Sequence, residues 1–131
     1  MINTLGNGVD IVENKRIFWA IKNEKFINKV YSKEEIKLSK RQANKTNYFA
    51  KRYAAKEAFL KAIGTGLRYG AKFKDISIKN NKLGKPFIKL NVNLKKMILK
   101  KFKIKKFEIH LSLSDEKKHS IAFVILNAKK L

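Results

Sequence analysis

Hydrophobic and polar positions divide the chain into short periodic segments. Residues 8–12 (GVDIV) are mostly apolar and β-branched, which is typical of a buried strand. The next two segments, 14–22 and 24–30, have the spacing of short helices. Ser32 and Glu35 then stand at the two positions of a capping box, which predicts the start of a third short helix.

The strongest helix signal covers residues 44–63, which are rich in Ala, Lys, Phe and Leu. Gly64 follows at the position of a left-handed C-cap. At 100° per residue the apolar side chains form one stripe, made of Phe49, Tyr53, Leu60 and Ile63. We expect this stripe to face the core and the helix to organise the fold.

The second half of the chain alternates between strand and helix patterns. Residues 75–79 and 86–90 alternate like two strands of a β-hairpin around a polar turn. Residues 94–102 have the pattern of a basic amphipathic helix, and residues 107–114 and 120–127 that of two antiparallel strands. The pattern therefore predicts an α+β fold, with the long helix packed on a mostly antiparallel sheet.

Length and composition favour one soluble domain covering residues 1–131, of which 44% are hydrophobic. The absence of cysteine excludes a Cys nucleophile, a thiolate zinc site and a disulfide framework. The longest apolar run, residues 121–126, is far shorter than the roughly 20 residues of a membrane helix. The first ten residues lack the features of a signal peptide, so we expect a cytoplasmic protein without a membrane partner.

The formal net charge is +22, which attracts polyanions. However, the basic residues are 28 Lys and only 4 Arg, accompanied by 12 Asn. Arg is the residue preferred for bidentate recognition of phosphate or guanine. A genome biased toward A and T would produce the same composition, with lysines scattered on solvated faces.

Two acidic residues stand in apolar surroundings. Asp10 lies between two β-branched residues, where it is an exposed edge position, a carboxylate bonded by backbone donors, or a cation ligand. Glu57 lies at the margin of the helical stripe, near Ala50, Ala54 and Lys61. The small alanines would let another group approach closely, whereas the simpler interpretation is an ion pair between Glu57 and Lys61.

The same helix carries the cations Arg52, Lys56 and Lys61. Lys56 projects among apolar side chains, so it either extends its ammonium to solvent or reaches a bound phosphate. The segment 64–66 (GTG) lacks the spacing of a Walker loop, and the chain has no dinucleotide-binding fingerprint.

In residues 107–114, alternation places His110, Ser112 and Ser114 on one face and Leu111 and Leu113 on the other. A polar face of this kind is usually solvated. If it lines a cleft, His110 could act as acid, base or phosphate donor near neutral pH.

Read together, these segments resemble the holo-[acyl-carrier-protein] synthases, which are short, single-domain 4'-phosphopantetheinyl transferases. The resemblance runs in order over nearly the whole chain. It is carried by residues 8–13 (GVDIVE), 15–17 (KRI), 49–66 (FAKRYAAKEAFLKAIGTG), 84–86 (GKP) and 110–114 (HLSLS).

The resemblance implies the 4'-phosphopantetheinyl transferase fold and its reaction in fatty acid biosynthesis. The 4'-phosphopantetheine arm of coenzyme A is transferred to a serine of apo acyl carrier protein, with release of adenosine 3',5'-bisphosphate. The reaction depends on Mg²⁺, for which two carboxylates and a pyrophosphate supply hard oxygen ligands.

The resemblance also implies roles for individual residues. Asp10 and Glu57 match the magnesium ligands, and Lys61 matches the active-site lysine. The residues placed at coenzyme A are Arg52, Lys56, Lys61, Gly64, Gly84, Lys85, Pro86, His110 and Ser112. Those placed at the carrier protein are Arg16 and Phe26. The base that activates the serine stays open between a metal-bound water, Glu57 and His110.

Two positions depart from the family pattern. Tyr53 stands where the family often has Phe, and Asp115 stands where many members have His.

The resemblance also implies an oligomeric state. Family members usually form trimers with active sites between chains. We therefore expect a homotrimer, in which Asp10 and His110 lie near groups of neighbouring subunits.

Two other classes of protein compete with the transferase. A small basic RNA- or ribosome-binding protein is favoured by the charge and by the lysine-rich residues 95–106, but the RNP, KH and zinc signatures are missing. A structural partner of an acidic protein would bind a carrier without turnover. Neither class explains Asp10 and Glu57, so we expect no nucleic-acid partner.

Overall fold

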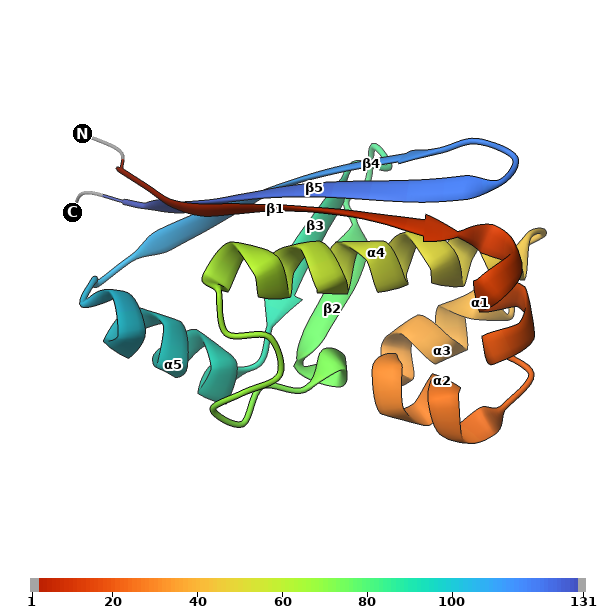
Figure 1. Cartoon of the computed structure of the whole chain (residues 1–131), viewed down its shortest axis with the longest axis horizontal. Coiled ribbons are helices and arrows are strands. Elements are labelled where there is room, and N and C mark those ends of the chain that lie inside the picture. Colours follow the sequence, from red (N-terminus) through yellow and green to blue (C-terminus); the bar gives the residue numbers. More distant parts are fainter. Residues whose placement is uncertain (1–2, 130–131) are drawn as a thin grey trace.

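The computed structural model of the chain describes residues 3–129 (Figure 1). Its elements follow in the order β1 (Asn3–Glu13), α1 (Asn14–Ala20), α2 (Glu24–Val30), α3 (Lys33–Ser39), α4 (Lys45–Ile63), a 3₁₀ turn (Phe73–Asp75), β2 (Ile76–Asn80), β3 (Pro86–Leu90), α5 (Val92–Phe102), β4 (Phe107–Asp115) and β5 (His119–Ala128). The order of helices and strands agrees with the hydrophobic pattern.

An antiparallel sheet with the strand order β1-β5-β4 covers one side of α4 (Figure 1). The hairpin of β2 and β3 forms a separate two-stranded sheet. Helices α1 to α3 gather near the first half of α4, and α5 lies near its last turns (Figure 1). The predicted α+β architecture, with the long helix on an antiparallel sheet, is confirmed.

Local signals in the sequence identify the start and end of several helices. The Ser32 hydroxyl accepts a hydrogen bond from the Glu35 N–H at 3.2 Å, and a Glu35 carboxylate oxygen accepts one from the Ser32 N–H at 2.9 Å. Gly64 ends α4 with φ of 77°, as the predicted left-handed cap requires. Helix α5 begins earlier than predicted, because the Asn91 side chain caps it by accepting from the Leu94 N–H.

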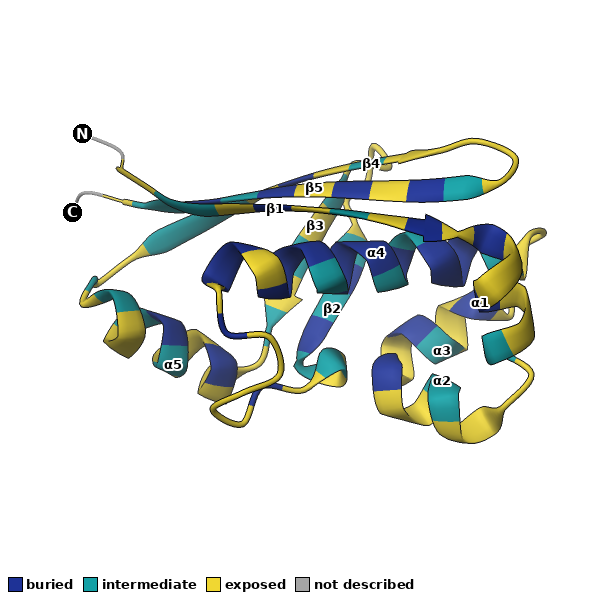
Figure 2. Ribbon diagram, viewed as in Figure 1, coloured by how far each residue is buried: buried dark blue, intermediate teal, exposed yellow. Residues whose placement is uncertain are grey.

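Helix α4 is buried on nearly all sides, so the predicted single apolar stripe is too narrow. Its buried residues include Ala54, Ala55 and Ala58, which lie outside that stripe. Most of the α4 ribbon is coloured as buried (Figure 2). The sheet covers one side of the helix, and α3, β2 and α1 contact its other sides. The side of an amphipathic helix that normally faces water is buried here. It therefore carries small residues, or polar residues that are paired with other groups of the protein.

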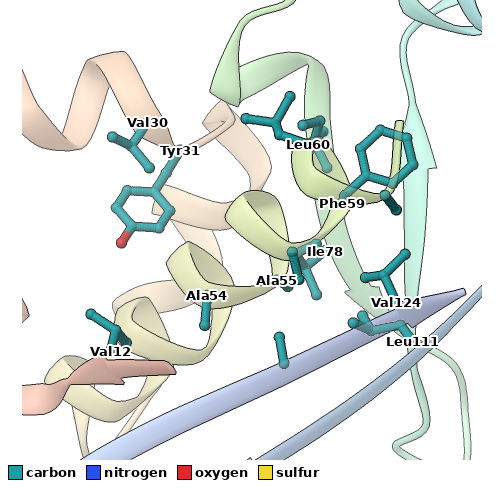
Figure 3. Close-up of a cluster of buried hydrophobic side chains, with 14 of the residues drawn as sticks. Val12, Val30, Tyr31, Ala54, Ala55, Phe59, Leu60, Ile78, Leu111 and Val124 are labelled. Atoms are coloured by element: carbon teal, nitrogen blue, oxygen red, sulfur yellow. The ribbon is translucent and has the colours of Figure 1, made fainter. Parts of the chain in front are cut away.

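The core joins side chains from every layer (Figure 3). Phe59 of α4 is fully buried and belongs to the same cluster as Val124 of β5 and Ile78 of β2. Burial of such side chains contributes about 1.5 to 3 kcal/mol each. The helix is therefore held to the sheet and to the hairpin by one continuous cluster.

Strand β1 packs on α4 backbone to backbone. A Cβ atom placed on Gly8 would lie 1.9 Å from the Ala58 carbonyl oxygen, and one placed on Gly6 would lie 2.0 Å from the Ala62 carbonyl oxygen. Only glycine in the strand, facing alanine in the helix, permits this approach. We call this contact the glycine seam; it lies at Ala58 and Ala62, whereas the sequence pattern indicated a close approach at Ala50 and Ala54.

Lys56 neither extends to solvent nor has donors to spare for a phosphate. Its ammonium is fully buried, lies 2.7 Å from a carboxylate oxygen of Glu35, and also donates to the carbonyl oxygens of Phe73 and Ile76. Desolvation lowers the pKa of Lys56, while the Glu35 charge opposes that shift. The other Glu35 oxygen accepts from the Ile78 N–H at 2.9 Å. The pair ties α3, α4 and β2 together, and the expected contact of Lys56 with the cofactor is replaced by this structural role.

We predict that Gly8→Ala lowers the free energy of unfolding by about 3 kcal/mol or more, because the added methyl group overlaps the Ala58 carbonyl. Urea denaturation followed by circular dichroism measures the change. The matched control is Asn7→Ala, whose side chain is exposed on the other face of β1 and whose effect should stay within about 0.5 kcal/mol. Equal stability of Gly8→Ala and the original chain would contradict the glycine seam.

Candidate active site

The glycine seam brings Asp10 and Glu57 to one place. Asp10 is on the same side of β1 as Gly8, because side chains alternate along a strand. Glu57 directly precedes Ala58, the residue that Gly8 contacts. Burial raises the pKa of Glu57, and the nearby charge of Asp10 raises it further. The two carboxylates therefore share one half-buried site, although they are distant along the chain.

Lys61 completes this cluster. Its ammonium lies 3.2 Å from a carboxylate oxygen of Asp10 and donates to the Val9 carbonyl oxygen at 2.9 Å. The sequence favoured an ion pair with Glu57 one turn away, whereas the lysine is bonded to β1 instead. Within residues 3–129, no hydrogen bond or ion pair engages the Glu57 carboxylate. Glu57 thus keeps both oxygens available for a ligand.

An open depression adjoins the cluster where α4 ends. It has a volume of about 420 Å³ and is lined by Glu57, Leu60, Lys61, Gly64, Gly66 and Leu67. Gly64 turns the chain away from the helix axis through its positive φ, so the depression stays open at the end of α4. A substrate group bound there would contact both Glu57 and Lys61.

The donor set suits a magnesium ion. Mg²⁺ typically binds one or two carboxylates and completes its octahedral shell with water and substrate phosphate oxygens. Asp10 and Glu57 supply two carboxylates, and the described part of the chain holds no group of three or more metal-ligating side chains. Burial and the neighbouring Asp10 charge both disfavour the ionised form of Glu57 and raise its pKa, and a divalent cation would favour that form.

A second cluster joins Arg52 to the turn between β2 and β3. A terminal nitrogen of Arg52 donates to the Asn80 side-chain oxygen at 2.9 Å, and the Asn80 amide donates to the Gly84 carbonyl oxygen at 2.9 Å. The sequence placed Asn80 only in a turn, so this bridging role was missed. Arg52, Gly84 and the adjacent Lys85 and Pro86 therefore belong to one structural unit.

A cavity of about 460 Å³ opens beside Arg52, with Lys51, Asn80 and Asp115 in its lining. The Arg52 guanidinium is buried, and its Nε has no hydrogen-bond partner among the described residues. Asp115 accepts from the Asn47 amide at 2.6 Å and lies 3.7 Å from the Lys51 ammonium. The departure at Asp115 thus places a carboxylate, with its own cation, at the rim of this cavity.

His110 and Ser112 lie on the opposite face of the sheet from Asp10. His110 pairs with the half-exposed Ile125, whereas Asp10 pairs with the fully buried Ala122. His110 is exposed, with its Nε2 atom 3.3 Å from a Glu108 carboxylate oxygen. A single chain therefore does not bring His110 to the acidic pair.

Arg16 and Phe26 meet around Tyr53. The Arg16 guanidinium lies 5.9 Å from the Tyr53 ring centroid, and the Phe26 ring lies 6.1 Å from it. Tyr53 stands one helical turn before Glu57, and burial and the Glu57 charge raise its pKa. The sequence placed Tyr53 in the apolar stripe and marked it as a departure from Phe, whereas its spacing of one helical turn from Glu57 indicates a place beside the acidic pair. The two proposed docking residues thus border the acidic pair.

Comparisons with known proteins identify the family of this chain. A family model described as the 4'-phosphopantetheinyl transferase superfamily matches residues 6–124. A holo-[acyl-carrier-protein] synthase of Pelagibacter ubique is 54% identical over 125 residues, covering 95% of this chain and 98% of that protein. The chain belongs to the holo-[acyl-carrier-protein] synthase family.

Solved structures of this family have the same fold. The holo-[acyl-carrier-protein] synthase of Neisseria meningitidis superposes with a TM-score of 0.86 at 38% identity, covering 98% of this chain and 100% of that one. The Bacillus anthracis enzyme, solved in complex with CoA (3',5'-ADP), superposes with a TM-score of 0.80 at 30% identity, covering 96% and 98%. In the part of the chain that the structure describes, no helix is long and apolar enough to span a membrane.

We predict that Asp10→Asn lowers the pKa of Glu57 toward the ordinary Glu value, because it removes the neighbouring negative charge. Burial still holds the pKa above that value. Carbon-detected NMR titration of the metal-free protein measures the shift. The pKa of Glu34, which Lys79 holds low elsewhere on the surface, should not change. An unchanged pKa of Glu57 would show that the two carboxylates do not interact.

Proposed function

We propose that this chain is a holo-[acyl-carrier-protein] synthase that transfers 4'-phosphopantetheine from coenzyme A to a serine of apo acyl carrier protein. Family membership supports this reaction, and one structural observation carries it. Two carboxylates from β1 and α4 share a half-buried site beside the ammonium of Lys61. Neither a nucleic-acid-binding protein nor a non-catalytic partner requires such a site.

Asp10 and Glu57 would hold the magnesium ion on which the reaction depends. When bound, the ion neutralises negative charge on the pyrophosphate of coenzyme A. The hydrogen bond to the Val9 carbonyl and the contact with Asp10 direct the Lys61 ammonium toward this site. It would stabilise the negative charge that develops on the departing bisphosphate.

In the transfer, the serine oxygen forms a bond to the phosphorus that carries the pantetheine arm. The bond from this phosphorus to the bridging oxygen breaks, and that oxygen leaves with adenosine 3',5'-bisphosphate. The serine proton needs an acceptor. Glu57 is the acceptor that this chain itself holds beside the site. His110 would need to come from a neighbouring subunit.

The nucleotide part of coenzyme A would bind at the cluster of Arg52, Asn80 and the turn of residues 84–86. This assignment is supported by the cavity beside Arg52 and by the Nε of its buried guanidinium, which has no hydrogen-bond partner among residues 3–129. The Bacillus anthracis relative was solved with CoA (3',5'-ADP). Lys56 is left out of the proposed contacts, because its donors are bonded to Glu35 and to two carbonyl oxygens.

We propose a homotrimer assembled through the outer face of the β1-β5-β4 sheet. This face carries four large apolar side chains that are 37% to 61% exposed, namely Val9, Ile11, Ile121 and Phe123. They form cross-strand pairs, Val9 with Phe123 and Ile11 with Ile121, so the apolar surface is continuous. The exposed His110 and Ser112 lie on the same face, where a trimer would bring them to another subunit's site.

The carrier protein would dock beside the acidic pair, at Arg16, Phe26 and Tyr53. An acidic carrier complements the exposed Arg16 and the net charge of +22, which speeds association at low salt. The aromatic rings of Phe26 and Tyr53 give the docking face an apolar centre. The serine of a carrier bound there would reach the site that holds Glu57.

We predict that Asp10→Asn and Glu57→Gln each reduce transfer by about 100-fold or more, since each removes a magnesium ligand. Lys61→Gln should reduce kcat by about 100-fold through loss of charge stabilisation. Mass spectrometry of apo carrier incubated with coenzyme A and Mg²⁺ follows the added phosphopantetheine mass. Lys96→Gln removes an equal charge from the exposed face of α5 and should retain the full rate. A magnesium-dependent rate unchanged in Asp10→Asn would overturn the assignment.

We predict that Phe123→Glu dissociates the trimer, because it places charge in the apolar sheet face. Light scattering after gel filtration measures the mass. Phe87→Glu is the matched control, since Phe87 is equally exposed, at 42%, but lies on β3 outside that face. A trimer that survives Phe123→Glu and dissociates in Phe87→Glu would contradict the proposed interface.

A further inference from the structure

A basic cavity lies outside the proposed transfer site, between the loop after α4 and the last turns of α5. Its volume is about 540 Å³. The side chains that line it are Thr65, Arg68, Tyr69, Met97, Lys100 and Lys101. It shares only Gly64 with the depression beside Glu57.

The charge of this cavity is unbalanced. Three of its lining residues are cations and none is acidic. Across residues 3–129, the ion pairs involve other lysines and histidines, and no carboxylate pairs with Arg68, Lys100 or Lys101. Cations that converge on a concave surface without a counter-ion repel one another, so a bound anion would stabilise them.

Arg68 is already oriented for such a ligand. Its Nε donates to the Thr65 carbonyl oxygen at 3.1 Å, which holds one edge of the guanidinium against the loop. The terminal nitrogens have no other partner within the described residues. A guanidinium held in this way offers the planar pair of donors that matches two oxygens of a phosphate.

The other part of the cavity is apolar. Tyr69 is 76% exposed and adopts a left-handed backbone conformation with φ of 61°. Met97 is half-buried beside it in the lining. An aromatic ring and a thioether next to three cations fit a ligand that carries both a phosphate and an apolar group.

Most lysines of this chain need no ligand to explain them. Lys100 and Lys101 also interact favourably with the C-terminal end of the α5 dipole. That effect does not account for Arg68, which comes from a different segment and is one of only 4 arginines. The convergence of two segments on one concave surface distinguishes this cavity from the scattered lysines.

We infer that the cavity is a second anion site, which binds a phosphate monoester bearing an apolar or aromatic group. The phosphate would lie between Arg68, Lys100 and Lys101, and the apolar group against Tyr69 and Met97. This assignment does not rest on the proposed transferase reaction, because it uses none of the residues placed at magnesium, coenzyme A or the carrier except the backbone of Gly64.

The test is an NMR titration of the ¹⁵N-labelled protein with phenyl phosphate, without Mg²⁺ and at constant ionic strength. We expect saturable amide shifts at residues 65–69 and 97–101, with tighter binding than inorganic phosphate or phenol produces. Shifts that do not saturate, or that occur only around residues 10 and 57, would overturn the inference.

Two double variants that remove the same charge show whether phenyl phosphate binds at this cavity or responds only to the net positive charge of the chain. Lys100→Gln with Lys101→Gln should weaken phenyl phosphate binding by about tenfold or more, a loss of about 1.4 kcal/mol. Lys96→Gln with Lys105→Gln removes the same charge outside the cavity and should change binding less than about twofold. Equal weakening in both would overturn the site. The transfer assay should be unaffected by the Lys100 and Lys101 changes, so the two proposals fail independently.

Discussion

The glycine seam between β1 and α4 is the contact on which the proposed active site depends. Gly6 and Gly8 let the strand approach the carbonyl oxygens of Ala62 and Ala58 so closely that a methyl group on either glycine would overlap them. At this separation the strand has little freedom to slide, because a shift of one residue would place the side chain of Asn7 or Val9 against the helix. Asp10 is therefore held beside Glu57 by backbone packing, to which the contact between its carboxylate and the Lys61 ammonium adds.

Glu35 of α3 and Glu57 of α4 differ in burial and in the partners of their carboxylates, and this difference distinguishes a structural residue from a site residue. Glu35 is buried with both oxygens bonded, and its partner Lys56 has no donor to spare, so this pair only joins α3, α4 and β2. Glu57 is half-buried, and its carboxylate has no such partner in the part of the chain that the structure describes. Desolvation and the charge of Asp10 raise its pKa. A carboxyl group whose pKa is higher in the folded protein than in the unfolded chain stabilises the fold when it is protonated, below the pKa of the unfolded chain. This stabilisation is lost as the pH rises through the pKa of the folded protein. At neutral pH the ionised Glu57 therefore lowers the free energy of unfolding, and a bound cation would offset that loss.

The local elements and the site residues differ in how far the sequence predicts them. The capping box at Ser32, the left-handed Gly64 and the alternating strands depend on neighbours in the chain, and these predictions are confirmed. The all-round burial of α4 and the pairing of Lys56 with Glu35 depend on which elements cover the helix, which periodicity does not record. A lysine among apolar residues predicts an unusual environment, but only the fold shows that a carboxylate from α3 fills it.

The residues proposed for the active site lie in separate places on one chain, which gives a physical reason for the proposed assembly of several copies. Asp10, Glu57 and Lys61 gather at the seam of β1 and α4, whereas Arg52 joins the turn after β2, and His110 and Ser112 face away on the outer sheet. No rotation of side chains within one chain can carry His110 through the sheet to Asp10. The outer face that holds His110 also exposes paired apolar side chains, which is unfavourable for a solitary chain. Covering that face with a second copy would satisfy both conditions at once, because it would bury Val9, Ile11 and Phe123 while placing His110 against another subunit.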